Sequence, residues 1–419
     1  MAASLGRLDL LQFARAYGCP WPKTLYSKAA EWGHVNVMAW ARVYGCPLDK
    51  DTCYVAASAG KLEALQWVYT NGCLLDEFTC KEASFGGNLV IVQWLRSNGC
   101  PWDEETCSMF ARGGHWTALQ WVRGNGCPWD WKTCYEIARG GHWGALQWVR
   151  ADGCPWNEMT CCGAAEGGHL DVLQWARANA CPWDEKTCSG AAGGGSGRLD
   201  IIQWARVNDC PWDKETCTMA ARGGHLDVLQ WARENGCPWD TETCRVAAEL
   251  GHLGVFKWAV LSGCPWNEDT SGLAAAEGHL GLLQWARENG CPWNEFTTSL
   301  AAAGGSLHCL QWARAAGCPW DEWTCHGAAG MGHLDILQWA RGNGCPWDET
   351  TCSFAAEGGH LDVLRWARAT GCSWNKETWN MAARCGNVNI LKWSRANGCP
   401  WDADLLQIAV NAGNNAIAA

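Results

Sequence analysis

The sequence predicts an all-α protein, a solenoid of stacked helix-turn-helix repeats. Three observations lead to this prediction: a marker cysteine that returns at a fixed interval, a helix-start signal after each marker, and glycines that divide each interval into two helices. A short period kept along a whole chain is typical of repeat proteins, in which each unit packs mainly on its neighbours. The marker cysteines are Cys19, Cys46, Cys73, Cys100, Cys127, Cys154, Cys181, Cys210, Cys237, Cys264, Cys291, Cys318, Cys345, Cys372 and Cys399.

The interval also sets the expected domain organisation. Successive markers are 27 residues apart, except for one step of 29 between Cys181 and Cys210. Cutting after the tryptophan that usually stands two residues beyond the marker gives fourteen full repeats in residues 22–401, with partial repeats at 1–21 and 402–419. We therefore expect residues 1–419 to form a single repeat array. The repeat at 184–212 carries two extra residues in a glycine-rich turn, where we expect a local bend or joint.

The first helix of a unit is illustrated by Asp103–Trp129. The first residue is Asp or Asn in all fourteen units from Asp49 onward, and the next positions favour Glu and Lys. An Asp or Asn oxygen there accepts hydrogen bonds from the free amides of the first turn, and acids suit the positive end of a helix. Gly113 and Gly114 are expected to end this helix after about nine residues.

The second helix follows a Gly-His turn and is illustrated by Leu226–Glu234. Its polar residues, Asp227, Gln230 and Glu234, form one narrow stripe, and apolar residues cover most of the remaining circumference. Such a helix is buried on more than one side, which requires neighbouring units. Asn235 and Gly236 then supply a left-handed end to the helix, and the following proline prevents its continuation.

These repeated residues resemble the ankyrin repeat family. The line that carries the resemblance is, in one unit, Thr216, Cys217, Ala220, Ala221, Gly224, His225, Leu226, Val228 and Leu229. The unit is six residues shorter than the 33 residues usual in the family, and most copies have Cys in place of the family's proline. The resemblance implies an ankyrin-like α-solenoid with reduced or absent β-hairpin fingers. Such short Cys- and Trp-rich units look most like ankyrin-type proteins of large DNA viruses and their algal or amoebal hosts.

The many Trp and Cys residues are interpreted as packing residues. Trp brings a large apolar area to the seam between repeats, and free Cys suits a protein interior. The C-x6-C spacing of Cys100 and Cys107 does not match zinc modules, and corresponding cysteines of adjacent units should be roughly 8 to 10 Å apart, too far for a disulfide. We therefore expect no cofactor, no metal site and no disulfide framework. Trp116 and Trp143 are expected to be core residues.

Histidines and acids recur in register without pointing to catalysis. The Gly-His histidine, as in His225, is placed to hydrogen-bond the turn between the helices, and Lys, Asn or Ser replaces it in other units. The capping Asp becomes Asn in several units, which preserves a cap but removes a general acid. We therefore expect a protein that is not an enzyme.

Composition limits the expected partners. The net charge is -11, and we find no local basic strip that would attract nucleic acid or anionic lipid. No apolar run is long enough for a membrane span, and no secretory leader is readable. We therefore expect no nucleic acid, no membrane and no small-molecule substrate, and a location in the cytoplasm or the nucleus.

Recognition is expected where the units differ, because the repeated positions are committed to folding. In ankyrin-like stacks the concave groove is lined by the first helix and the turn before it, which correspond here to unit positions two, three, six, seven and ten. Aromatic and Arg side chains are frequent anchors of protein interfaces. The candidate partner-binding residues are Phe78, Arg112, Trp131, Arg139, Arg222, Phe296, Trp323 and Arg384.

The resulting hypothesis is a non-enzymatic scaffold that binds a partner protein along this concave face. One alternative is an adaptor that recruits partners to host ubiquitin or signalling machinery. A second alternative, from a different class, is a thiol-rich protein that binds metal or takes part in redox chemistry.

Overall fold

The computed structural model describes residues 2–49, 51–195 and 197–401. Across these ranges the ordered elements are helices, and no strand occurs in them. The predicted all-α repeat fold without β-hairpin fingers is therefore confirmed. The partial repeat at 402–419 lies outside the described residues, and so does Ser196 of the glycine-rich turn.

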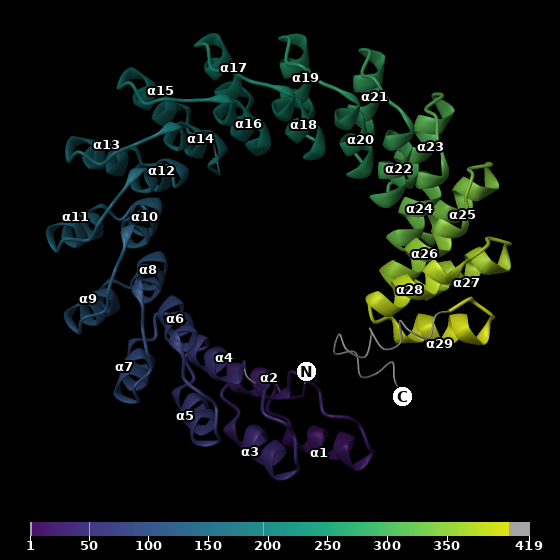
Figure 1. The fold of residues 1–419 in the computed structure, drawn as a ribbon. Coiled ribbons are helices and arrows are strands. Elements are labelled where there is room, and N and C mark those ends of the chain that lie inside the picture. The colour runs from purple at the N-terminus through teal and green to yellow at the C-terminus, as the bar shows by residue number, and fades with distance from the viewer. Residues whose placement is uncertain (1, 50, 196, 402–419) are drawn as a thin grey trace. The chain divides into compact units, whose positions relative to one another are not determined.

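Each full unit contributes one even-numbered helix followed by one odd-numbered helix (Figure 1). The even-numbered helices are α2 (Leu25–Glu31), α4 (Thr52–Ser58), α6 (Glu77–Phe85), α8 (Glu104–Arg112), α10 (Trp131–Arg139), α12 (Glu158–Glu166), α14 (Glu185–Gly193), α16 (Lys214–Gly223), α18 (Thr241–Glu249), α20 (Glu268–Ala276), α22 (Glu295–Ala303), α24 (Glu322–Gly330), α26 (Glu349–Gly358) and α28 (Lys376–Arg384). The odd-numbered helices are α1 (Leu8–Ala16), α3 (Val35–Val43), α5 (Leu62–Thr70), α7 (Leu89–Ser97), α9 (Trp116–Gly124), α11 (Trp143–Ala151), α13 (Leu170–Ala178), α15 (Leu199–Val207), α17 (Leu226–Glu234), α19 (Leu253–Leu261), α21 (Leu280–Glu288), α23 (Leu307–Ala315), α25 (Leu334–Gly342), α27 (Leu361–Ala369) and α29 (Val388–Ala396).

The helices belong to two compact parts, residues 1–212 with α1–α15 and residues 213–419 with α16–α29. Within each part, an even-numbered helix packs against the next even-numbered helix and against the odd-numbered helix of its own unit. The even-numbered helices therefore form one row and the odd-numbered helices a second row. That the whole chain forms a single array stays a prediction.

The helix-start signal acts as predicted. The Asp103 side chain accepts hydrogen bonds from the amides of Glu105 and Thr106, and the Asn157 side chain accepts one from Met159. Both capping residues have extended backbone, which is the usual conformation of a helix N-cap. Because Asp and Asn offer the same acceptor oxygen, the exchange between them leaves the helix start intact.

The Gly-His turn also joins successive units. The ring nitrogen Nε2 of His252 lies 3.0 Å from the carbonyl oxygen of Arg222, which belongs to the preceding unit. In other units Asn387 donates to the Ala356 carbonyl at 2.8 Å, and Ser306 donates to the Ala276 carbonyl at 2.8 Å. The expected contact with the turn is therefore a bond between repeats, and the Asn and Ser residues that replace His keep it.

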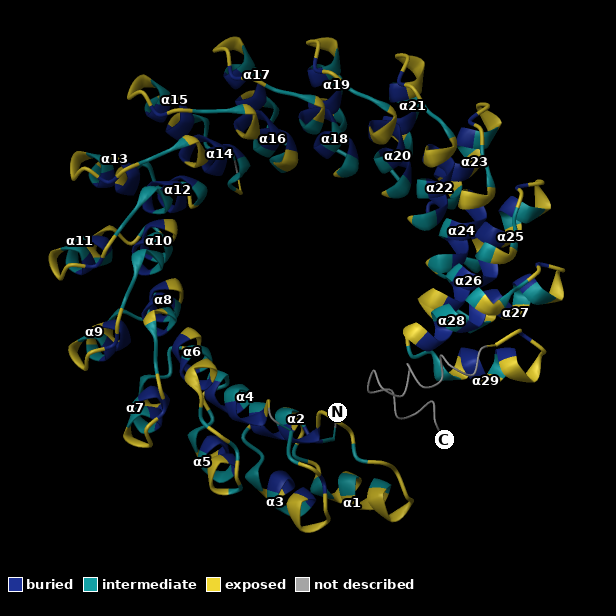
Figure 2. Cartoon of the chain, in the orientation of Figure 1, coloured by how far each residue is buried: buried dark blue, intermediate teal, exposed yellow. Residues whose placement is uncertain are grey.

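The core consists mainly of small residues and thiols. Nearly all marker cysteines are buried, whereas the tryptophans that follow them are only half-buried. Trp129 packs edge-to-face on Trp148 with ring centroids 5.9 Å apart, and the Arg123 guanidinium covers its other side at 4.1 Å. The tryptophans therefore pack along the outer boundary between units, which we call the outer seam, and not in the buried core. The exposed residues gather at the far ends of the odd-numbered helices (Figure 2).

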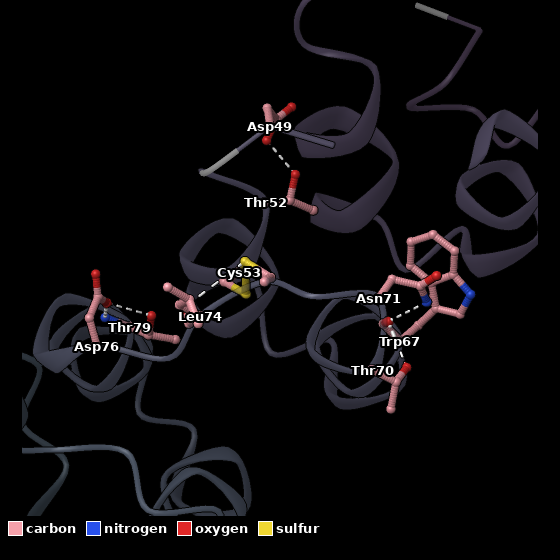
Figure 3. The surroundings of a disulfide bond; sticks show 10 residues. Asp49, Thr52, Cys53, Trp67, Thr70, Asn71, Leu74, Asp76 and Thr79 are labelled. Atoms are coloured by element: carbon pink, nitrogen blue, oxygen red, sulfur yellow. Dashed lines mark hydrogen bonds between the residues drawn. A yellow bond between two sulfur atoms is a disulfide. The ribbon is translucent and has the colours of Figure 1, made fainter. Parts of the chain in front are cut away.

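Two packing predictions are wrong. Trp143 has 47% of its surface exposed, so it is not a core residue, because its place at the start of α11 faces solvent. The prediction that the cysteines form no disulfide fails at Cys53 and Cys73, which are bonded with Cα atoms 6.5 Å apart (Figure 3). The two bonded cysteines are 20 residues apart in sequence. Neither the C-x6-C spacing nor the expected distance between equivalent cysteines of adjacent units indicates this pairing.

Candidate binding surface

An apolar hollow lies on the row of even-numbered helices in the part formed by residues 213–419. It has a volume of about 390 Å³ and lies across α22, α24 and α26; we call it the α24 hollow. Its lining residues are Phe296, Ser299, Leu300, Ala303, Trp323, His326, Gly327, Gly330, Met331, Phe354, Glu357 and Gly358. They occupy unit positions three, six, seven, ten and eleven, four of which are among the five variable positions singled out in the sequence.

Small residues on α24 create this hollow. Gly327 and Gly330 stand where most other units carry larger side chains. Gly327 lies so close to α22 that an added Cβ would be 3.0 Å from the Ser299 carbonyl oxygen. The aromatic rings of Phe296 and Trp323 stand beside the resulting gap, with 54% and 56% of their surfaces exposed. Exposed aromatic rings beside an apolar gap are typical of a surface that is covered by a partner.

The wall of the hollow is held by His326. This side chain is buried, and its Nε2 lies 2.8 Å from Oδ1 of Asp348, the residue that caps α26. The His326 ring stacks on Phe354 at 5.6 Å and meets Trp323 edge-on at 5.2 Å. Burial favours a higher pKa for Asp348, but the hydrogen bonds from His326 and from the Thr350 amide outweigh it, so this pKa lies below its ordinary value.

The charges around the hollow are negative. The helices α22, α24 and α26 contain no Lys or Arg among their residues. Each begins with an exposed glutamate, namely Glu295, Glu322 and Glu349, and exposed Glu357 lines the hollow. The surface therefore favours a cationic group beside an apolar one.

Of the eight candidate residues, the structure brings together Phe296 and Trp323. Phe78, on α6, packs edge-to-face on Tyr54 with centroids 5.1 Å apart. Trp131, at the start of α10, contacts Tyr135 of the same helix at 6.5 Å. Each of these two residues contacts one neighbouring ring, although 42% of the Phe78 surface is exposed, and neither lines the α24 hollow.

The four candidate arginines end even-numbered helices. The Arg112 guanidinium lies 5.5 Å from the Phe85 ring centroid, and Arg139 Nε lies 3.8 Å from Glu166 Oε2. Arg222 and Arg384 are exposed at the ends of α16 and α28. None of the four lines the α24 hollow.

Three larger lining residues were not among the sequence candidates. Leu300 and Phe354 stand at position seven, which the sequence marks as variable, so a search for apolar as well as aromatic residues there would have found them. Met331 stands at position eleven, usually Gly, and gave no such signal.

Among the described residues there is no group of three or more His, Cys, Asp and Glu side chains placed to hold a metal ion. In the same part of the chain, no helix has the length and apolar character that crossing a membrane requires.

Comparison with known proteins finds similar solved structures but no match in sequence. No family model matches it, and no curated protein matches it in sequence. It is similar in fold to a pentatricopeptide repeat protein, PPR10, in complex with an 18-nucleotide psaJ RNA element, at 15% identity and a TM-score of 0.38 over 96% of this chain and 71% of the other. It is also similar to the human ASB11 ankyrin repeat domain, at 18% identity and a TM-score of 0.32 over 38% of this chain and 84% of the other. The class of protein that its own helices define is a helical-repeat solenoid.

The expectation that excluded nucleic acid as a partner is wrong. Similar solved structures include a repeat protein bound to RNA. A row of arginines is not evident from the sequence. One Arg in every 27 residues forms no local cluster, although stacking of the units brings such residues into register. Its members, each stacked on the tryptophan six residues later, are Arg15, Arg96, Arg123, Arg150, Arg177, Arg206, Arg233, Arg287, Arg314, Arg341, Arg368 and Arg395.

Proposed function

We propose that this protein is a non-enzymatic binding scaffold that holds a polypeptide partner on the α24 hollow. The observation that carries this proposal is the exposure of Phe296 and Trp323 beside an apolar gap, on helices that otherwise repeat the same fold. A buried aromatic anchor in a pocket is the usual centre of a protein interface. The ankyrin-like pattern of the units is consistent with such a role.

The charges indicate the chemistry of the partner segment. An apolar side chain would enter the α24 hollow beside Phe296 and Trp323, and a Lys or Arg next to it would face Glu322 or Glu357. A segment with one or two large apolar residues and a flanking basic residue therefore fits the surface best.

Selection from a random peptide display library against the full chain tests this proposal. We expect enriched peptides to combine aromatic or aliphatic residues with Lys or Arg, and to lose binding to a Trp323→Ala variant. Enrichment that survives this substitution would contradict the proposed site. Displacement of the bound peptides by single-stranded RNA would instead assign the α24 hollow to nucleic acid.

A further inference from the structure

The two cysteine rows form a series of thiol pairs, each made by a cysteine of an even-numbered helix and the marker cysteine 20 or 22 residues later. Cys80 Sγ lies 3.2 Å from Cys100 Sγ. In the other pairs, a hydrogen bond between the thiols together with burial raises the pKa of one member. These pairs are Cys107 and Cys127, Cys134 and Cys154, Cys161 and Cys181, Cys188 and Cys210, Cys217 and Cys237, Cys244 and Cys264, Cys325 and Cys345, and Cys352 and Cys372.

A typical pair is covered by the Arg and Trp of the outer seam. Cys80 and Cys100 have at most 1% of their surfaces exposed. The Arg96 guanidinium lies 3.9 Å from the Trp102 ring centroid and donates a hydrogen bond to the Cys100 carbonyl at 2.8 Å. A thiol in solution has no path to this pair without displacing the stack.

The pair formed by Cys53 and Cys73 lacks this cover. Leu48 and Leu75 stand where most other units carry the seam tryptophan, and Tyr69 stands at the position of the stacked arginine. Cys53 has 1% of its surface exposed, but Cys73 is partly exposed and lines a hollow of about 550 Å³, which we call the Cys73 hollow. This pair is bonded as a disulfide (Figure 3).

The lining of the Cys73 hollow carries both signs of charge. Arg42 comes from the end of α3, and Asp49 and Asp76 come from the starts of two successive units. Leu48 and Leu74 complete the apolar part of the wall. A ligand with a carboxylate, an ammonium group and a short apolar or thiol-bearing stem matches this combination.

We propose that the Cys53–Cys73 disulfide is a redox site that exchanges with low-molecular-weight thiols bearing a carboxylate and an ammonium group. The thiolate of the small molecule attacks Cys73 Sγ, the partly exposed sulfur. The bond between the two protein sulfurs breaks, a mixed disulfide forms on Cys73, and Cys53 leaves as a thiolate that takes a proton. A second small thiolate attacks the sulfur of the bound molecule, releases the oxidised dimer and leaves Cys73 as a thiol after protonation.

The overall step is balanced in atoms and electrons. Two small thiols and the protein disulfide give one small-molecule disulfide and two protein thiols, so the two electrons come from the small thiols. The reverse step uses the same small-molecule disulfide as oxidant. The pair under the Arg96 and Trp102 stack is the internal comparison, because it has the same position in its unit but no hollow beside it.

Cysteine accessibility in the full-length native chain tests the proposal, with reduced and oxidised glutathione as the probe. After each incubation the chain is quenched with acid, freed of glutathione, unfolded in guanidinium chloride at neutral pH, labelled with isotope-coded iodoacetamide and mapped by peptide mass spectrometry. We expect Cys53 and Cys73 to gain label with reduced glutathione and to lose it again with oxidised glutathione. Cys80 and Cys100 are free thiols from the start and should carry the label in both samples, because oxidised glutathione does not reach them. In a Cys53→Ser variant treated with oxidised glutathione, Cys73 should gain one glutathionyl group with release of one reduced glutathione.

A Leu48→Trp variant provides the matched control. The new indole stands six residues after Arg42, the spacing at which Arg96 stacks on Trp102, and should fill the Cys73 hollow. We expect exchange at Cys53 and Cys73 to slow on the order of tenfold while the circular dichroism spectrum stays unchanged. The proposal is overturned if Cys53 and Cys73 exchange no faster than Cys80 and Cys100, or if Leu48→Trp folds normally and leaves the rate unchanged.

Discussion

Two regions of the even-numbered row have the same helical fold but differ in the chemistry of their surfaces. They are α8–α12 in one compact part and α22–α26 in the other. In the first, Glu105 pairs with Lys81 and Lys132, and Arg139 with Glu166. In the second, position three holds Phe296, Trp323 and Thr350, and the helices contain no Lys or Arg. Position ten holds Ala303, Gly330 and Glu357.

This difference shows that the repeated positions maintain the fold, whereas the variable positions determine the chemistry of the surface. The capped helix starts and the buried marker cysteines occur in both regions, so they cannot account for a difference in binding. Side chains at positions three, six, seven, ten and eleven line the apolar hollow of the second region, whereas the first region presents an ionic surface. Substitutions at the repeated and at the variable positions should therefore have different effects.

The largest expected effect concerns binding. Trp323→Ala should weaken the binding of a peptide selected against the native chain by about 30-fold or more, because an aromatic anchor in a pocket commonly contributes about 2 kcal/mol. Trp131→Ala, in the ionic region, should change the affinity by less than about threefold. Fluorescence anisotropy of the labelled peptide measures both. Similar losses in the two variants would remove the distinction between the regions.

A smaller effect is expected for the helix caps, and it should be equal in both regions. Asp130→Ala and Asp321→Ala each remove the acceptor for a first-turn amide and should lower the free energy of unfolding by about 1 kcal/mol. Asp130→Asn and Asp321→Asn should cost only a few tenths, since Asn also caps. Urea unfolding followed by circular dichroism gives these values. If the Ala substitution lowers the free energy of unfolding in one region and not in the other, the caps do not contribute equally to the stability of the two regions.

The smallest effect concerns the ionic surface. Hydrogen bonds from Lys81 and Lys132 lower the pKa of Glu105, so its pKa is lower in the folded than in the unfolded chain. The associated stability is present above the ordinary carboxyl pKa and is lost as the pH falls through the folded value. Glu105→Gln should therefore cost about 0.5 kcal/mol at neutral pH and nothing in strong acid.

A double-mutant cycle that combines Glu105→Gln with Lys132→Met tests whether this loss of stability comes from the ion pair. The coupling between Glu105 and Lys132 should be measurable at neutral pH in low salt and should vanish in acid or in high salt. A cost of Glu105→Gln that is the same at every pH would mean that packing, rather than charge, is responsible.

The sequence was sufficient to predict the fold because each of its signals is local. Asp103 caps the next turn and Gly236 ends a helix in the left-handed conformation, with φ of +83°. The α24 hollow was less accessible to sequence analysis, because it results from residues of three units acting together. Phe296 and Trp323 stood out as aromatic, but Gly327 and Gly330 became informative only once α22, α24 and α26 lay side by side.

The thiol pairs were missed for a related reason. Cys53 and Cys73 are 20 residues apart, with a full helix between them, and no sequence rule relates such a separation to a distance in space. The signal that was available lay in the exceptions, since Leu48 and Leu75 replace the seam tryptophan around this pair.

The most direct test of the account converts one surface into the other by a Gly330→Arg substitution. Position ten is Arg in α8 and α10, and a Cβ at Gly330 would be 3.4 Å from Phe354, an ordinary contact. If the variable positions carry recognition, the variant should unfold at the same urea concentration as the native chain and bind the selected peptide on the order of 100-fold more weakly. Unchanged peptide affinity in a normally folded Gly330→Arg variant would contradict the account.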